Sequence, residues 1–157
     1  MPLVRHAMLA HLKPASCFLL AILLAACAVK PLHRDTFSFA VLGDTPYTET
    51  EEQNMEWMID DLNKLDLAFV VHVGDFKAGG DSPCSDAVFE KRKLQFNKSA
   101  HPFIYTPGDN DWTDCRRESN GALDPLERLN KLRETFFSSA YALGARPLPV
   151  IRKHLMA

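Results

Sequence analysis

The most informative stretch of the chain is FIYTPGDNDWTDC, which runs from Phe103 to Cys115. In it an apolar run breaks at a Pro-Gly pair into three carboxylates and one amide. Two earlier apolar runs end similarly, since FAVLGD closes on Asp44 and FVVHVGD closes on Asp75. A single Gly-Asp pair says little, because Asp is a common turn residue. Three such endings on successive runs predict one shared site.

The order of apolar runs and helix signals predicts an α/β fold that reads β-α-β-α-β-α. Strands are expected at residues 36–42, 67–73 and 102–106, the first buried and the second covered on both faces. Helices are expected to begin at a Thr48 cap, after Ser82-Pro83 from about Ser85, and at an Asp124 cap. Such an order predicts mainly parallel strands with right-handed crossovers.

The loops of a parallel sheet gather at the carboxyl edge of its strands, where ligands bind. We therefore expect Asp44, Asp75, Asp109 and Asn110 to meet at that edge. Basic residues elsewhere are expected to be solvated. These are Lys91, Arg92, Lys93 and Lys98 on the second helix, and Lys77 in a loop, for which contact with a phosphate is the alternative.

The composition suits a single globular domain. The chain has 157 residues, of which 46% are hydrophobic and 24% charged, an ordinary balance for a folded protein. Its formal net charge is -2, and no basic stripe with interleaved aromatic residues occurs. Nucleic acid is therefore not an expected partner.

The first 27 residues are expected to lie outside that domain. Arg5 and Lys13 precede an apolar segment at 15–26 that ends in small residues, as in an export signal. The sequence LAAC, which ends at Cys27, resembles the bacterial lipobox, in which the Cys is lipidated. The alternative is a transmembrane anchor, but a membrane span requires roughly 20 apolar residues and this run is shorter.

The lipobox resemblance implies an exported protein that is lipid-anchored to the bacterial membrane and faces the periplasm. Ala28 after the Cys favours the outer membrane. Residues 28–35 would form a tether, and residues 36–157 a partial domain. Of the four cysteines, only Cys84 and Cys115 then fall in the folded part. In an oxidising compartment they are candidates for a disulfide, with two free thiols as the alternative.

Oxygen-bearing side chains at the carboxyl edge suit hard metal cations. Two metals about 3.5–4 Å apart can clamp a phosphoryl group and activate a water. The three motifs resemble those of the calcineurin-like metallophosphoesterases, and GDND followed by WTDC is similar to a bacterial subgroup of predicted metallophosphoesterases. The resemblance covers roughly residues 36 to 150 and implies the N-terminal half of an αββα sandwich.

By this resemblance Asp44 and Asp75 are metal ligands, and Asp75 bridges two metals. The run GDND, from Gly108 to Asp111, stands where the family has Gly-Asn-His and an acid. Aligned on its Gly, Asp109 takes the place of the ligand Asn, and Asn110 takes the catalytic place of the His that assists the leaving group. Aligned one residue later, Asn110 is itself the ligand.

Two further residues are expected to support the ligands from nearby, namely His72 and Asp111. For His72, which lies inside a strand, direct ligation is the alternative. The chain departs from the family pattern in two respects. Pro46, followed by Tyr47, stands where a His is usual, and no Gly-His-x-His motif occurs.

The resemblance implies divalent or mixed Fe, Zn and Mn ions, two in the full family site, and a phosphate-ester substrate attacked by a metal-activated water. One hypothesis is therefore an exported metal-dependent phosphoesterase-like domain. Another is a catalytically inactive, truncated lipoprotein that at most binds a divalent cation. A third is an oxygen-liganded Mg²⁺ phosphatase that needs no histidine. With only three of the family's strands, one sheet face should lack a partner, which predicts low stability or an oligomer that buries this face.

Overall fold

Residues 36–151 contain three parallel strands and three α-helices in the predicted α/β order, which is thereby confirmed. The computed structural model describes residues 36–151. The expected signal segment, its Cys27 and most of the tether lie outside these residues. The elements are β1 (Ala40–Leu42), α2 (Glu49–Leu62), β2 (Val70–His72), α3 (Asp86–Phe96), β3 (Phe103–Tyr105), two short 3₁₀ helices η1 (Thr113–Arg116) and η2 (Glu118–Asn120), and α4 (Pro125–Phe136). No helix in residues 36–151 is long and apolar enough to cross a membrane.

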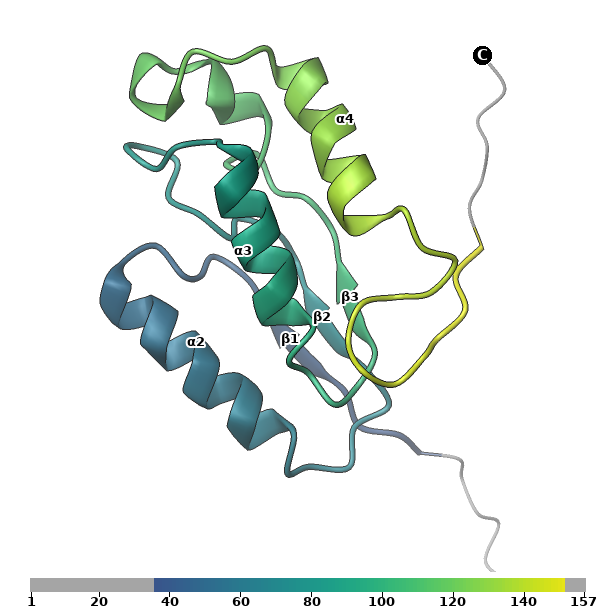
Figure 1. Ribbon diagram of the computed structural model, residues 1–157. Coiled ribbons are helices and arrows are strands. Elements are labelled where there is room, and N and C mark those ends of the chain that lie inside the picture. The colour runs from purple at the N-terminus through teal and green to yellow at the C-terminus, as the bar shows by residue number, and fades with distance from the viewer. Residues whose placement is uncertain (1–35, 152–157) are drawn as a thin grey trace, which may run out of the picture. The chain divides into compact units, whose positions relative to one another are not determined.

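The sheet has the strand order β1-β2-β3, and both strand pairs are parallel. Each connection carries the chain one strand further in the same direction. Right-handed crossovers that all advance in one direction place their helices on the same face of the sheet. Figure 1 shows this arrangement, with α2, α3 and α4 all on one side of the strands.

The core lies between that face and the helices. Leu42, His72 and Tyr105 are neighbours across the three strands, and the last two are buried. The buried apolar residues packed around them are Met55, Ile59, Leu67, Val70, Phe76, Phe89, Phe96, Phe103, Leu132 and Phe136. A single aromatic-rich core therefore supports the strands from one side.

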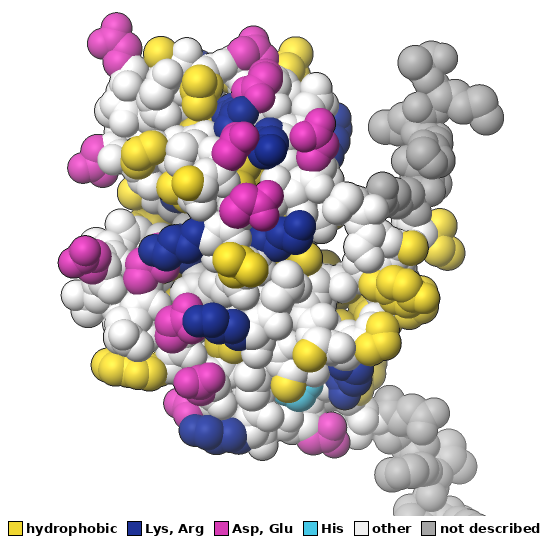
Figure 2. All heavy atoms as spheres, viewed as in Figure 1, with side chains coloured by type: hydrophobic (Ala, Val, Ile, Leu, Met, Phe, Trp, Pro, Cys, Tyr) yellow, Lys and Arg dark blue, Asp and Glu magenta, His cyan; other side chains and the backbone are white. Residues whose placement is uncertain are grey.

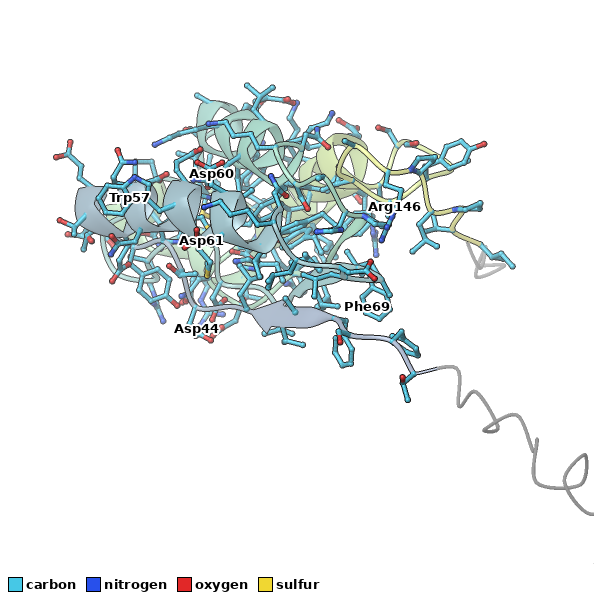
Figure 3. All side chains as sticks on the ribbon, turned by 90° about the horizontal axis from the view of Figure 1, so that it is seen from below. Asp44, Trp57, Asp60, Asp61, Phe69 and Arg146 are labelled. Carbon is cyan, nitrogen blue, oxygen red and sulfur yellow. A yellow bond between two sulfur atoms is a disulfide. The ribbon has the colours of Figure 1, made fainter. Side chains whose placement is uncertain are left out.

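The opposite face of the sheet is largely uncovered. Phe39 is 50% exposed, Val41 57% and Val73 49%. In Figure 3, β1 forms one margin of the folded unit, with the helices on its other side. The expectation of a buried first strand and of a second strand covered on both faces is therefore wrong, because every helix packs on the same face.

The helices begin where their capping residues predict. The Thr48 hydroxyl accepts from the Glu51 N–H at 3.2 Å, and the Asp124 carboxylate accepts from the Glu127 N–H at 2.8 Å. Ser85 caps α3 in the same way. These side chains satisfy backbone donors that the first turn of a helix leaves unpaired.

Arg92 is the main exception among the basic residues expected to be solvated. Its side chain is buried, and its two terminal nitrogens donate to the two carboxylate oxygens of Glu52 at 3.1 and 2.8 Å. The cause is helical spacing, since Arg92 lies three residues after Phe89 and four before Phe96 and so shares their core-facing side. The charge is tolerated there because it is paired.

Cys84 and Cys115 form a disulfide. It joins the loop that precedes α3 to η1, and both cysteines are fully buried. The bridge thereby ties the loop after β2 to the loop after β3, the two loops that carry Asp75 and Asp109.

Reduction of this disulfide is expected to lower the free energy of unfolding by about 3 kcal/mol, because the bridge closes a long loop. The two cysteines are 31 residues apart in sequence. Urea unfolding with and without a reductant measures the change, and the Cys84→Ser/Cys115→Ser variant serves as the control. That variant should unfold at the lower midpoint and not respond to the reductant. An unchanged midpoint on reduction of the native chain would contradict the prediction.

Candidate metal site at the carboxyl edge of the sheet

Sharp turns follow the first two strands and present Asp44 and Asp75. Both residues have left-handed backbone conformations, with φ angles of 54° and 56°, which Asp tolerates better than most residues do. The Asp44 N–H donates to the Gly74 carbonyl at 3.1 Å. The two turns are thus joined to each other directly after their strands end.

The glycines of the repeated motif let the turns pack closely. A Cβ on Gly74 would lie 2.2 Å from the Gly108 nitrogen, and a Cβ on Gly108 would lie 2.1 Å from Asp75 Oδ1. Neither position has room for a side chain. Gly74 also has a φ of 99°, which favours glycine. The Gly-Asp pattern therefore reflects the contact between the second and third loops.

Asp75 occupies the centre of the cluster. Its Oδ1 accepts from the Asn110 N–H at 3.0 Å. Burial raises the pKa of Asp75, and the negative charges of Asp109 and Asp44 raise it further, whereas the Asn110 N–H opposes the rise. The bond from the Asp44 N–H to the Gly74 carbonyl and the bond from the Asn110 N–H to Asp75 hold the three loops next to one another.

Tyr47 is a member of the cluster that the sequence interpretation did not include. Its hydroxyl donates to Asp44 Oδ1 at 3.2 Å. Burial and the neighbouring Asp44 raise the pKa of Tyr47, so its proton stays in place. Its position in the sequence could have indicated this membership, because Tyr47 lies three residues after Asp44 and just before α2.

Asp111 lies behind the cluster and is fully buried. Its carboxylate accepts from the backbone N–H groups of Asp75, Phe76 and Gly108 at 3.0, 2.9 and 2.9 Å, and from the Tyr105 hydroxyl at 2.8 Å. Burial raises the pKa of Asp111 to about 6. Asp111 therefore holds the second and third loops together from the inside and does not face the open edge.

His72 connects the first two loops. The Gly74 N–H donates to its Nδ1 at 3.1 Å, so in the neutral ring Nε2 carries the proton and donates to the Thr45 carbonyl at 3.0 Å. Both ring nitrogens are occupied by the backbone. His72 thus positions the turn that carries Asp44, and no ring nitrogen is left for a metal.

The ring of His72 is expected to remain neutral down to low pH. Burial lowers its pKa to about 4, because a charged ring would be desolvated and could no longer accept from Gly74. His72 therefore contributes stability that is complete above about pH 6.5 and is lost as the pH falls toward 4. The pKa of Asp111 is raised, so its protonation changes the stability in the opposite direction over the same pH range. A stability curve would therefore not isolate His72, and the ring itself must be observed.

NMR of the His72 ring protons against pH provides that measurement. The midpoint should lie near pH 4 in the folded chain and near the ordinary value of about 6.5 in urea. A folded-state midpoint at or above 6.5 would show that the ring is not buried between the two turns.

Lys77 is buried, contrary to the expectation of a solvated loop lysine. Its ammonium donates to the Ala78 carbonyl at 2.9 Å, and the side chain is 1% exposed. Burial lowers the pKa of Lys77, while the charges of Asp111 and Asp114 oppose the shift. Lys77 thus balances the buried carboxylates and is not open to a phosphate in solution.

The donor atoms at the edge fit hydrated hard cations such as Mg²⁺ better than Fe or Zn. Among the described residues, no group of three or more His, Cys, Asp and Glu side chains could hold a metal ion. The edge offers the Asp44, Asp75 and Asp109 carboxylates and the Asn110 amide. The backbone of Gly79 lies close to one of these donors, since a Cβ on Gly79 would be 2.3 Å from Asn110 Oδ1.

These donors all present oxygen. Such a set fits a hydrated hard cation such as Mg²⁺, which uses one or two carboxylates and keeps several waters. Fe and Zn sites, which favour imidazole or thiolate, fit less well. His72 is already hydrogen-bonded at both nitrogens, and Cys84 and Cys115 are joined.

Comparison with known protein families, curated proteins and solved structures finds no match to the chain. Over residues 36–151 the chain is a mixed α/β protein with three parallel strands and three α-helices.

Proposed function

We propose that the chain is an exported, metal-dependent phosphoesterase-like domain related to the calcineurin-like metallophosphoesterases. The observation that carries the proposal is the meeting of acidic loops from three successive parallel strands. The Asp44 N–H donates to the Gly74 carbonyl and the Asn110 N–H donates to Asp75, so the three loops join at the edge where ligands of such sheets bind. The proposed setting, a lipid anchor at Cys27 on the periplasmic side of the outer membrane, rests on the sequence motif.

The proposed chemistry assigns a part to each residue at the edge. Asp44, Asp75 and Asp109 or Asn110 would hold a divalent cation. When bound, such a cation supplies charge stabilisation to a phosphoryl group and lowers the pKa of a water. Tyr47 donates to Asp44 and so fixes the orientation of that carboxylate. Asp111, from behind, keeps the backbone turns in register.

The substrate class follows from what the edge lacks. Asn110 stands where a leaving group would be assisted, and an amide cannot supply a proton as an imidazolium can. His72 is engaged on both sides. Aryl phosphates, whose leaving groups need little protonation, should therefore be better substrates than alkyl phosphates.

A second function, cation binding without catalysis, is favoured by a separate observation. Within residues 36–151 no group of three protein ligands of the common metal-binding types is assembled. A loosely held cation could neutralise the acidic edge and stabilise the loops without activating a water. The chain would then be an inactive relative of the enzymes.

Two measurements on the purified chain separate these functions. Calorimetric titration with Mg²⁺ and with Mn²⁺ tests cation binding, and release of p-nitrophenol from p-nitrophenyl phosphate tests hydrolysis. The enzyme proposal predicts binding together with metal-dependent hydrolysis that is abolished by a chelator. Binding without hydrolysis supports the second function. Absence of both overturns the two proposals together.

A further inference from the structure

The sheet face turned away from the helices is an apolar surface. We call it the open face, and it consists of Phe37, Phe39, Val41, Phe69, Val71, Val73 and Ile104. Val41, Val71 and Ile104 are neighbours across the three strands. The Phe39 and Phe69 rings stack with their centroids 5.1 Å apart, and the Phe37 ring lies 6.1 Å and 6.0 Å from them.

The exposure of this face is unusual for a parallel sheet. Parallel strands are ordinarily covered on both faces, yet here Phe37 is 66% exposed and Val41 57%. Each of the seven residues is apolar and uncharged. Large contiguous apolar patches on a folded unit mark interaction sites. By contrast, on the surface shown in Figure 2, which is viewed as in Figure 1, Lys and Arg side chains are interspersed with Asp and Glu.

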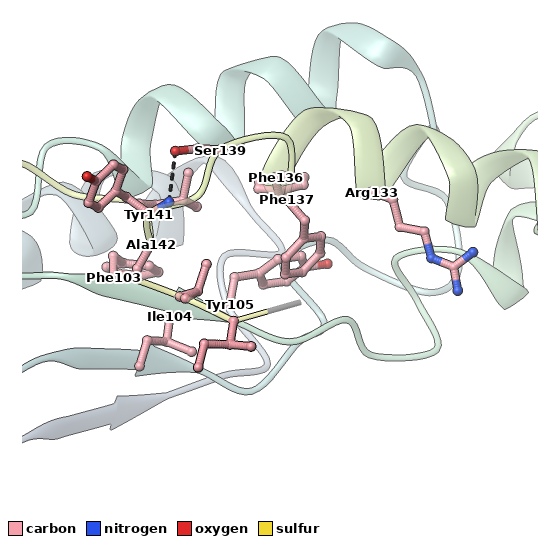
Figure 4. A pocket seen from close by; sticks show the side chains of 12 residues that line it. Phe103, Ile104, Tyr105, Arg133, Phe136, Phe137, Ser139, Tyr141 and Ala142 are labelled. Carbon is pink, nitrogen blue, oxygen red and sulfur yellow. Dashed lines mark hydrogen bonds between the residues drawn. The ribbon is translucent and has the colours of Figure 1, made fainter. Parts of the chain in front are cut away.

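The apolar surface also continues around the edge of the sheet. Ile104 belongs both to the open face and to the lining of a hollow of about 490 Å³. Phe103, Tyr105 and Phe137 contribute aromatic rings to this hollow, which lies between β3 and the end of α4 (Figure 4). Beside β3 the chain returns and pairs Leu143 with Phe103. Arg133 also lines this hollow, so the uncharged contact surface is the open face itself.

We propose that the open face binds the open face of a second copy of the chain, which gives a symmetric homodimer. Two arguments select a second copy. First, an uncharged face meets no like-charge repulsion when it contacts itself, as a two-fold interface requires. Second, the area suffices, since a large apolar side chain buries roughly 150–250 Å². Most of this area comes from Phe37, Phe39, Val41 and Val73, which are 66%, 50%, 57% and 49% exposed; the face offers on the order of 500 Å² per copy, or roughly 1,000 Å² for a pair, the lower limit of specific interfaces.

Val41→Lys is the variant that tests the proposal. In a two-fold dimer the added charge appears twice within one desolvated interface. The matched control is Leu94→Lys, because Leu94 is 67% exposed on α3, on the helix-covered side. Sedimentation equilibrium of the purified full chain over a range of concentrations gives the mass, and far-UV circular dichroism monitors folding.

The native chain should sediment as a dimer that dissociates on dilution. Val41→Lys should weaken dimerisation about tenfold or more, and Leu94→Lys should leave it unchanged. If Val41→Lys does not fold, Phe39→Ser replaces it, because that residue precedes β1 and forms no part of the strand.

Three results would overturn the proposal. One is a folded native chain that stays monomeric at every concentration. Another is a dimer that Val41→Lys or Phe39→Ser leaves as stable as the control. The third is a monomer that binds neutral phosphatidylcholine vesicles and loses this binding in the open-face variants, which would assign the face to a lipid surface. None of these measurements depends on metal binding or hydrolysis.

Discussion

Asp111→Ala is expected to lower the free energy of unfolding by about 4 kcal/mol, a large part of the total for a domain of this size. The side chain is fully buried and accepts four hydrogen bonds. Three of its donors are backbone N–H groups in the loops after β2 and β3. Each buried donor left without a partner costs about 1–3 kcal/mol. Relief of the buried charge, whose pKa is raised to about 6, offsets only part of that loss.

Urea unfolding of Asp111→Ala beside two other variants locates the cause. Asp111→Asn keeps the volume but presents an N–H₂ group to donors, so it should also be destabilised. Asp109→Ala removes an exposed carboxylate from the same turn and should change stability by less than about 0.5 kcal/mol. Equal effects of the two alanine variants would show that the turn does not depend on the inward carboxylate.

The sequence predicted the loops of the site and two of the side chains that support them, His72 and Asp111, but not the contacts that each makes. Asp44, Asp75 and Asp109 each follow a strand, and topology alone places strand ends at one edge. Which carboxylate of the run Asp109 to Asp114 turns inward depends on the backbone of the turn, and residue type does not specify that. Tyr47 therefore emerged only from the structure, as did the inward orientation of Asp111.

Two other predictions, a solvated Arg92 and a buried first strand, were wrong although the sequence contained evidence against them. Arg92 shares the spacing of Phe89 and Phe96, and Glu52 on α2 provides a partner for its charge. The positions of Phe37, Phe39 and Val41 alternate, which places all three on one face of an extended segment. Apolar content alone suggested burial. Whether a partner covers that face is a tertiary property that a local pattern does not contain.

Asp75→Asn is expected to abolish metal-dependent hydrolysis, by at least about a hundredfold, and to weaken cation binding at least tenfold. Asp75 accepts from the loop after β3 and is the central ligand of the proposed cation site, so its loss removes a carboxylate from that site. The Asn110 N–H can still donate to the amide oxygen of the new side chain, and the loop should therefore keep its shape.

The same substitution should stabilise the metal-free chain, and this separates a metal ligand from a structural residue. Because burial and like charge raise the pKa of Asp75, its ionised form is less favourable in the folded chain than in the unfolded chain. A neutral amide avoids this electrostatic cost, so the thermal unfolding midpoint without metal should rise. The increase in that midpoint on adding Mg²⁺ or Mn²⁺ should disappear. Asp81→Asn, an exposed carboxylate in the same loop, is the matched control and should retain the metal-dependent increase. A metal-dependent increase that survives in Asp75→Asn would remove Asp75 from the site.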